Sequence, residues 1–243
     1  MSCHSGAVFN MQAVFKREPL RRELPLNVVD LWFARLPEMN RSLDTLLSAD
    51  ELRRALRFRS ERDAGNFVAR RGLLRMILAT YTGVPPSQLS FTYSPLGKPA
   101  LNGCFYDLRF SLSQSGELAV YAVARRRNIG VDLERLQQMN PDIPGIAKSF
   151  FSEEQIALLN DTPGDQKEEA FLRLWTQLEA RGKASGNGIG GLDSDPSGLN
   201  SFLGKCFSFT TTVPNPGYVV ALAVQGRRRC SLRTAGFHVP PGL

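Results

Sequence analysis

Histidine is nearly absent from this chain, whose 243 residues include only His4 and His238, near opposite ends. Serine–histidine catalysis, cysteine–histidine catalysis and histidine-based zinc chemistry are therefore disfavoured. The four cysteines are far apart and form no CxxC pair, which argues against a zinc site of the usual spacing and against a disulfide framework. If the chain is an enzyme, carboxylates, lysines and a metal ion must carry the chemistry.

The sequence also lacks a run of about 18 apolar residues, so no membrane-spanning helix is predicted. Its first stretch, MSCHSGAVFNMQAVFKREP, lacks the basic start and apolar core of a secretory signal. Together with the dispersed cysteines, these absences predict a cytoplasmic protein with reduced thiols and no membrane partner.

Acidic residues are outnumbered, because 30 Lys and Arg face 23 Asp and Glu, which gives a net charge of +7. Such a surface favours anionic partners: nucleic acid, a phosphorylated small molecule or an acidic protein. A merely solvated basic surface explains the balance equally well. Against a nucleic-acid-binding module, the aromatic residues are not interleaved with the basic ones and no binding motif is found. We therefore expect no nucleic-acid partner.

Two segments of the chain resemble each other and predict matching strands. Gly116 opens GELAVYAVA and Gly217 opens GYVVALAVQ, each after a turn-like pair of residues. Both segments predict core strands entered through a glycine turn. A hydrophobic content of 42% suffices for a sizeable core around them.

A long helix is predicted upstream of each strand, over residues 60–83 and 165–186, and each stretch ends near glycine. Their apolar residues recur at helical spacing: Phe67, Leu74, Ile77 and Leu78 in the first, Phe171, Leu174, Trp175 and Leu178 in the second. We predict an α+β fold of two pseudo-symmetric halves, each a long helix packed on a small antiparallel sheet. The halves would be residues 1–126 and 127–243.

The stretch NIGVDLERL, from Asn128, places two carboxylates in an otherwise apolar strand. On an extended strand Asp132 and Glu134 share one face, about 7 Å apart. Two acids this close repel unless a cation lies between them, and Mg²⁺ suits oxygen ligands of this kind. An edge strand whose acids pair with arginines is the alternative, and two carboxylates alone favour it.

The second predicted helix adds an acid and a base on one face, because Glu179 and Lys183 are four residues apart. An exposed salt bridge, worth about 0.3–0.5 kcal/mol, explains such a pair on any helix. Alternatively, Glu179 completes a site of three carboxylates and Lys183 neutralises a phosphate.

Four stretches in this order resemble the 4′-phosphopantetheinyl transferases, in particular the larger, two-halved type that activates surfactin synthetase. They run from about residue 50 to 190: ERDAGNFVARRGLLRMIL, with Arg71; GKPAL, with Lys98; FSLSQSG, with Ser113 and Gln114; and IGVDLE followed by WTQLEARGKASGNGI. The last two match the family signatures Gly-x-Asp-x-Glu and Trp-x-x-x-Glu-Ala-x-x-Lys.

The resemblance implies the roles of individual residues at an active site between the halves. Mg²⁺, or Mn²⁺ in its place, would bind Asp132, Glu134 and Glu179, and Glu179 and Lys183 would be catalytic. Coenzyme A would be held by Arg71, Lys98, Ser113, Gln114 and Lys183, with Arg71 the expected contact of the 3′-phosphate.

The resemblance also implies a reaction. The 4′-phosphopantetheine arm of coenzyme A would pass to a serine of an apo acyl- or peptidyl-carrier protein. The products would be the holo carrier protein and adenosine 3′,5′-bisphosphate, in fatty-acid, polyketide or nonribosomal peptide synthesis. The carrier is expected to be acidic, and the enzyme, with both halves in one chain, a monomer. A Mg²⁺-dependent phosphohydrolase or nucleotidyl transferase is the rival enzyme class.

Two positions depart from the family pattern. Gln114 stands where the family has histidine, and Leu178 stands where a lysine often precedes the helical glutamate. An amide still donates a hydrogen bond but carries no charge. These departures raise the alternative of an inactive relative. The first 45 residues and the tail CSLRTAGFHVPPGL match no motif, and we predict a poorly ordered tail.

Overall fold

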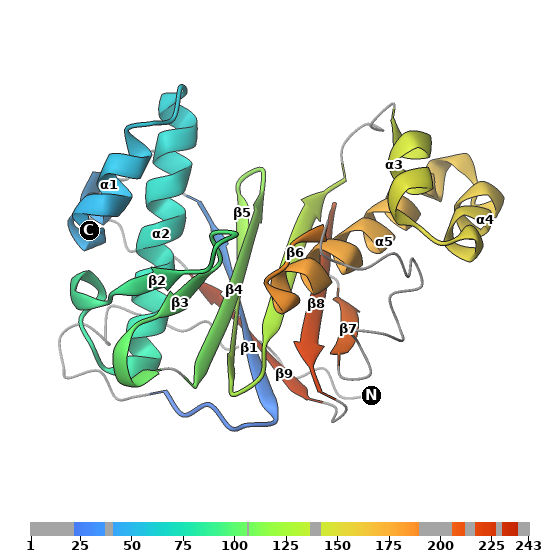
Figure 1. Cartoon of the computed structure of the whole chain (residues 1–243). Coiled ribbons are helices and arrows are strands. Elements are labelled where there is room, and N and C mark those ends of the chain that lie inside the picture. Colours follow the sequence, from blue (N-terminus) through green and yellow to red (C-terminus); the bar gives the residue numbers. More distant parts are fainter. Residues whose placement is uncertain are drawn as a thin grey trace.

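The computed structural model describes residues 22–36, 41–105, 107–136, 142–189, 206–211, 217–226 and 230–237. Two sheets lie between two long helices in the order helix, sheet, sheet, helix (Figure 1). The first sheet has the strand order β4-β5-β1-β9 and the second has the order β6-β8-β7. The strands of these sheets are β1 Val28–Arg35, β4 Leu108–Ser115, β5 Leu118–Arg125, β6 Ile129–Arg135, β7 Cys206–Thr211, β8 Tyr218–Gln225 and β9 Ser231–Phe237.

The long helices are α2, Glu61–Thr82, and α5, Gly164–Ser185. Shorter elements complete the two halves: 3-10 helix η2 Arg41–Leu46, helix α1 Ala49–Ala55, η3 Pro86–Gln88, the paired strands β2 Phe91–Tyr93 and β3 Pro99–Leu101, η4 Gly103–Phe105, and helices α3 Ile143–Phe150 and α4 Glu153–Asp161. Helices α3 and α4 lie beside the start of α5, at one end of the molecule (Figure 1).

The two halves repeat one topology. The series β1, α2, β4, β5 in the first half matches β6, α5, β7, β8 in the second, and the order of the three strands is the same in both sheets. Within these two series the strands pair antiparallel. The predicted α+β fold with two halves and small antiparallel sheets is therefore confirmed.

The core has one layer on each side of the first sheet. Strands β1 and β5 are buried on both faces, because Trp32 and Tyr121 pack with α2, whereas Leu31 and Ala122 pack against the second sheet. This burial explains why β5 is apolar from Leu118 to Ala124 and β1 from Leu31 to Ala34. Helix α2 ends where predicted, at Gly83 in the left-handed conformation. The apolar residues predicted for both helices are buried or half-buried.

The C-terminal segment departs from the expectation of a poorly ordered tail. Residues Ser231–Phe237 form β9, which pairs parallel with β1 at the edge of the first sheet. The described residues thus include a strand from late in the chain that joins the sheet of the first half. The boundary between the halves, at residues 126 and 127, remains a prediction. Strand β9 comes after this boundary in the chain, yet it belongs to the sheet of the first half.

A buried carboxylate ties β9 to β1. Asp30 is 1% exposed, and Arg233 of β9 donates to its Oδ1 at 2.6 Å. Arg22 at 2.9 Å and the hydroxyl of Tyr81 at 2.6 Å donate to its Oδ2. A buried charge is tolerated only when it is paired in this way, so the network fixes β9 on β1.

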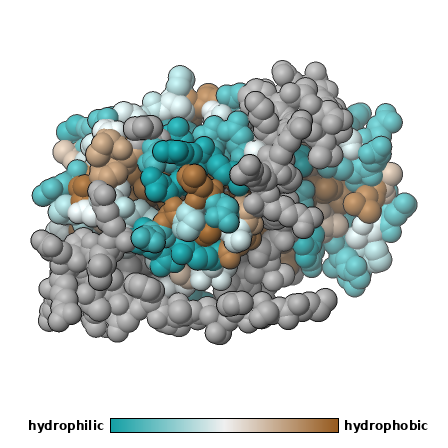
Figure 2. All heavy atoms as spheres, turned by 90° about the horizontal axis from the view of Figure 1, so that it is seen from below, coloured by the Kyte–Doolittle hydropathy of each residue, from teal (hydrophilic) through white to brown (hydrophobic). Residues whose placement is uncertain are grey.

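None of the described helices is long and apolar enough to cross a bilayer. Seen from below, the coloured residues show hydrophobic groups set among hydrophilic ones (Figure 2). The large apolar side chains that are more than half exposed are scattered along the chain: Leu26, Leu56, Leu96 and Leu158. Scattered exposure of this kind is ordinary for a globular surface.

We predict that Arg233→Met lowers the free energy of unfolding by about 1.5–3 kcal/mol, because the buried Oδ1 of Asp30 loses its charged donor. Arg35→Met on β1 is the matched control, since Arg35 and Glu117 form an exposed pair worth less than about 1 kcal/mol. Urea unfolding of both variants measures the difference. Equal losses in the two variants would contradict the role given to Asp30.

Candidate active site

Helix α5 packs directly on strand β6 because one strand position has no side chain. A Cβ atom added to Gly130 would lie 1.9 Å from the carbonyl oxygen of Ala180 and 2.4 Å from the nitrogen of Ala184. Among the described side chains, the buried apolar cluster beside this contact is made of four alanines, two from α5 and two from β8: Ala180, Ala184, Ala221 and Ala223. Small side chains on both surfaces therefore bring the helix backbone into contact with the sheet.

The same face of β6 carries the two predicted carboxylates. Residues alternate along a strand, so Asp132 and Glu134 point to the face of Gly130 and thus to α5. Val131 and Leu133 point the other way, into the core between the sheets. The two faces explain why a buried strand contains two acids. One face of β6 turns the acids toward α5, and the other turns apolar side chains into the core.

Asp132 is buried, with 2% of its surface exposed. Its Oδ1 accepts hydrogen bonds from the ammonium group of Lys183 at 2.6 Å and from the hydroxyl of Ser113 at 2.8 Å. Its Oδ2 is buried and has no hydrogen-bond partner among the described residues. An unpartnered carboxylate oxygen inside a protein is costly, and a cation or donor from a ligand would satisfy it.

The charge of Asp132 acts on both glutamates of the site. Burial raises the pKa of Glu134, and the charge of Asp132 raises it further, against a hydrogen bond from Ser115. Burial likewise raises the pKa of Glu179, where Lys183 acts in the opposite direction and Asp132 adds to the rise. The three acids therefore repel one another, which is the condition that favours a bound cation.

The serines of β4 join the two halves at this point. Strands β4 and β6 are edges of different sheets, and hydroxyl groups connect them. Ser111 accepts from the backbone nitrogen of Val131 at 3.1 Å and Ser115 from that of Arg135 at 3.0 Å. The serine side chains therefore serve as acceptors for one edge of β6 and bring Ser113 to Asp132.

A cleft of about 520 Å³ collects most of the predicted site residues, a size typical of small-molecule sites. Those that line it are Arg71, Ser113, Gln114, Asp132, Glu134, Glu179 and Lys183. A smaller hollow of about 220 Å³ adjoins it, shares Glu179 and Lys183, and is lined by Lys98. The family resemblance predicts that these residues share one site, and all eight line the cleft or the hollow.

The three acids are not arranged as a finished metal site. Within the described ranges, no group of three His, Cys, Asp or Glu side chains is placed to hold one ion. The donor chemistry and the unpartnered Oδ2 of Asp132 nevertheless fit a hard cation such as Mg²⁺. The metal-binding roles of Asp132, Glu134 and Glu179 therefore stay predictions.

Arg71 already has strong partners within the protein. Its Nε donates to Glu51 at 2.6 Å and its guanidinium donates to the hydroxyl of Tyr93 at 2.8 Å. Arg75 holds the other carboxylate oxygen of Glu51 at 2.8 Å. Burial works to raise the pKa of Glu51, yet Arg71, a backbone N–H and Arg75 outweigh it and the pKa is lowered. Arg71 is thus fixed at the wall of the cleft.

Two further arginines line the cleft and were missed by the sequence analysis. The Nε atom of Arg70 is buried without a hydrogen-bond partner among the described residues, and no described carboxylate forms an ion pair with Arg70 or Arg54. Both guanidinium groups lie near the ring of Phe67, at 6.0 and 5.6 Å from its centroid. The adjacent arginines Arg70 and Arg71 are visible in the sequence, but only the fold shows which of them forms no ion pair with a described carboxylate.

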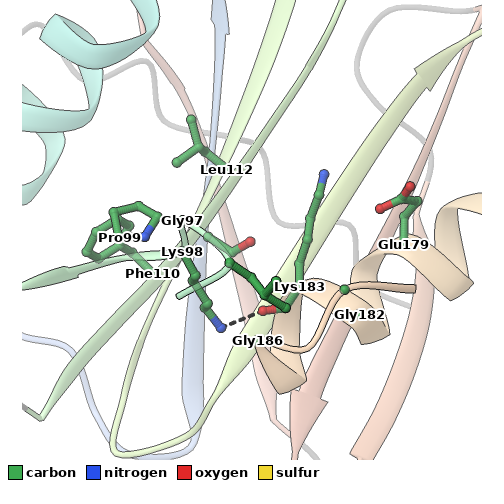
Figure 3. A pocket seen from close by; sticks show the side chains of 12 residues that line it. Gly97, Lys98, Pro99, Phe110, Leu112, Glu179, Gly182, Lys183 and Gly186 are labelled. Carbon is green, nitrogen blue, oxygen red and sulfur yellow. Dashed lines mark hydrogen bonds between the residues drawn. The ribbon is translucent and has the colours of Figure 1, made fainter. Parts of the chain in front are cut away.

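Lys98 lies at the junction between the halves. Its ammonium group donates to the main-chain carbonyls of Lys183, Ala184 and Ile129. Burial and the charge of Arg109 lower the pKa of Lys98 to about 8. In Figure 3, Glu179 and Lys183 extend from α5 in the same general direction, while Lys98 reaches the main chain of the same helix.

The two departures from the family pattern have different settings. Gln114 lines the cleft and donates to the carbonyl of Gly116 at 3.2 Å. Leu178 packs with Phe171 and Trp175 in the apolar cluster that joins α3 and α4 to α5. A leucine at this position therefore contributes to packing where a lysine would have contributed charge.

We predict that Gly130→Ala destabilises the protein by about 3 kcal/mol or prevents folding, because the new methyl group overlaps the backbone of α5. Gly236→Ala is the matched control in another strand, where an added Cβ meets no atom within 4 Å. Thermal unfolding followed by circular dichroism measures both. An unchanged midpoint for Gly130→Ala would contradict the contact.

Comparison with known proteins assigns both halves. The family described as the 4′-phosphopantetheinyl transferase superfamily matches residues 128–218, and the family described as 4′-phosphopantetheinyl transferase, N-terminal, matches residues 31–126. The transferase HetI of Nostoc sp. is 38% identical over 229 residues, which cover 89% of this chain and 95% of HetI. A 4′-phosphopantetheinyl transferase of Bacillus subtilis is 30% identical over 188 residues, covering 77% and 76%. The chain therefore belongs to the 4′-phosphopantetheinyl transferase family and is an enzyme of its two-domain type.

Proposed function

We propose that the enzyme transfers the 4′-phosphopantetheine arm of coenzyme A to a serine of an apo acyl- or peptidyl-carrier protein. The serine Oγ forms a bond to the phosphorus that carries the pantetheine arm, and the bond from this phosphorus to the bridging oxygen breaks. The products are the holo carrier protein and adenosine 3′,5′-bisphosphate. One observation carries the proposal: a single cleft contains three carboxylates and Lys183 together with a group of arginines.

The metal requirement follows from the acids. Asp132, Glu134 and Glu179 are the residues that would hold Mg²⁺ or Mn²⁺, and the buried Oδ2 of Asp132 is the atom that most needs a cation. When bound, the ion would stabilise the negative charge of the diphosphate and of the departing phosphate.

Lys183 and Glu179 act on the reacting groups in this proposal. Lys183 donates to Ser113 at 3.0 Å and to Asp132 at 2.6 Å. Its charge is thus fixed in the cleft, where it neutralises the diphosphate and the leaving phosphate. Glu179 is half-buried and lines the same cleft, so it takes the serine proton or, as the third carboxylate, shares the metal.

The arginine end of the cleft suits the nucleotide end of coenzyme A. Arg71 is oriented by Glu51 and Tyr93, and Arg54 and Arg70 add two guanidinium groups that pair with no described carboxylate. Guanidinium groups bind phosphate with charge-assisted hydrogen bonds. We therefore assign the 3′-phosphate to Arg71 together with Arg54 and Arg70, and the remaining contacts to Ser113, Gln114 and the loop of Lys98.

The carrier protein in this proposal is acidic and the enzyme acts as a monomer. The net charge of +7 suits an encounter with an acidic carrier, which should weaken as the salt concentration rises. The rival class, a Mg²⁺-dependent phosphohydrolase or nucleotidyl transferase, would use the same acids but would not modify a carrier.

We predict that the wild-type enzyme, incubated with coenzyme A, Mg²⁺ and an apo carrier protein, adds one phosphopantetheine unit to the carrier. Asp132→Asn and Glu179→Gln should each lower turnover on the order of 10²–10³-fold, because charge stabilisation or proton transfer is lost. Intact-mass spectrometry of the carrier measures the product.

Glu169→Gln is the matched control, because Glu169 is a half-buried acid on α5 that pairs with Arg173 and does not line the cleft. It should retain wild-type turnover. Full activity of Asp132→Asn, or no mass gain with any of several acyl and peptidyl carriers despite an intact fold, would contradict the proposed reaction.

We predict that Arg70→Met weakens the binding of coenzyme A by about tenfold and leaves the binding of dephospho-coenzyme A unchanged, because only the former carries the 3′-phosphate. Isothermal titration calorimetry gives both dissociation constants. Arg62→Met, at an exposed position of α2 outside the cleft, should change neither. Equal weakening for both ligands would place the 3′-phosphate elsewhere.

A further inference from the structure

The ammonium group of Lys98 is fully engaged by main-chain carbonyls. Its Nζ lies 2.5 Å from the oxygen of Lys183, 3.2 Å from that of Ala184 and 3.4 Å from that of Ile129. An ammonium group has three N–H donors and no acceptor. Three carbonyl partners therefore use its donors completely, and none is left for a phosphate of coenzyme A.

Two of these carbonyls belong to the last turn of α5. The final four carbonyls of a helix have no partner within the helix, and this end carries a partial negative charge. Helix α5 ends at Gly186 in the left-handed conformation, and the chain folds back over Gly182. Lys98 supplies a positive charge and two hydrogen bonds to this end, from outside the helix. Figure 3 shows the bond to the carbonyl of Lys183.

The donor comes from the other half of the molecule and is itself rigidly held. Lys98 follows a tight turn between β2 and β3, in which Gly97 has a φ of 80°. The nitrogen and the carbonyl oxygen of Lys98 both bond to Ser94, at 3.0 and 2.9 Å. The side chain thus connects a fixed turn of the first half to the helix end of the second.

We propose that Lys98 is a positioning residue for Lys183. It holds the main chain at Lys183 in place, and that main chain directs the ammonium group of Lys183 to Ser113 and Asp132 at 3.0 and 2.6 Å. The third bond goes to the carbonyl of Ile129 at the start of β6, three residues before Asp132, so one side chain aligns helix and strand together. The proposal rests on the proposed function for its kinetic consequences.

A double-mutant cycle tests whether Lys98 acts through Lys183. Lys98→Met keeps the length of the side chain but removes the donors, and should lower kcat at least about tenfold, because a displacement of about 1 Å at a reacting group has effects of that size or larger. In the background of Lys183→Met, the same change should cost no more than about twofold. A loss by the same factor in both backgrounds would show that Lys98 contacts the cofactor independently and would overturn the proposal.

Amide hydrogen exchange gives a readout that does not depend on transfer. Lys98→Met should accelerate exchange in the last turn of α5, and Lys148→Met, an exposed lysine of α3, should leave both exchange and kcat unchanged. Unaltered exchange in Lys98→Met would overturn the proposal even if the wild-type enzyme proved to transfer nothing. Absence of transfer by the wild type, with accelerated exchange in the variant, would instead contradict only the proposed function.

Discussion

The contact between helix α5 and strand β6 determines where every acid of the site lies. Gly130 has no side chain, so the carbonyl of Ala180 and the nitrogen of Ala184 come against the strand. The alternation of β6 then turns Asp132 and Glu134 to the helix, and the helical period places Glu179 and Lys183 one turn apart on it. A larger side chain at residue 130 would separate two surfaces whose proximity defines the cleft.

The charges of the site are balanced across the two halves. The second half supplies the acids and Lys183, whereas the first supplies Ser113, Ser115 and the arginines of α1 and α2. Asp132 is buried and depends on Lys183 and Ser113 for one of its oxygens. Buried polar networks of this kind are stabilising only when their members are satisfied. The remaining oxygen of Asp132 is the place where this network is incomplete.

Much of this arrangement could be predicted from sequence. The helical spacing of apolar residues located α2 and α5, and the two glycine-led segments located β5 and β8. The motifs around Asp132 and Glu179 predicted the family, which the comparisons confirm. These features are local, so short stretches of sequence contain them. The predicted roles of the eight site residues are not tested by the fold, although it brings all of them to adjoining hollows.

The features that sequence reasoning missed depend on contacts between distant segments. Strand β1 lies in the first 45 residues, where no motif was found, and β9 was expected to be poorly ordered. Both are explained by their pairing with each other and by the buried link from Asp30 to Arg233. The contacts of Lys98 were also missed, because the residues whose carbonyls it contacts are 31 or more positions away in the chain. Arg70 was missed because only the three-dimensional structure shows that no described carboxylate pairs with it.

The central claim is that acids from β6 and from α5 form one cation site over a bound diphosphate. A crystal structure of the enzyme with coenzyme A and Mn²⁺, with anomalous scattering used to locate the metal, tests this claim most directly. The account predicts a metal peak at the Oδ2 atom of Asp132, with Glu134 or Glu179 as a further ligand and the diphosphate against Lys183. A metal bound away from Asp132, or a diphosphate outside the cleft, would contradict it.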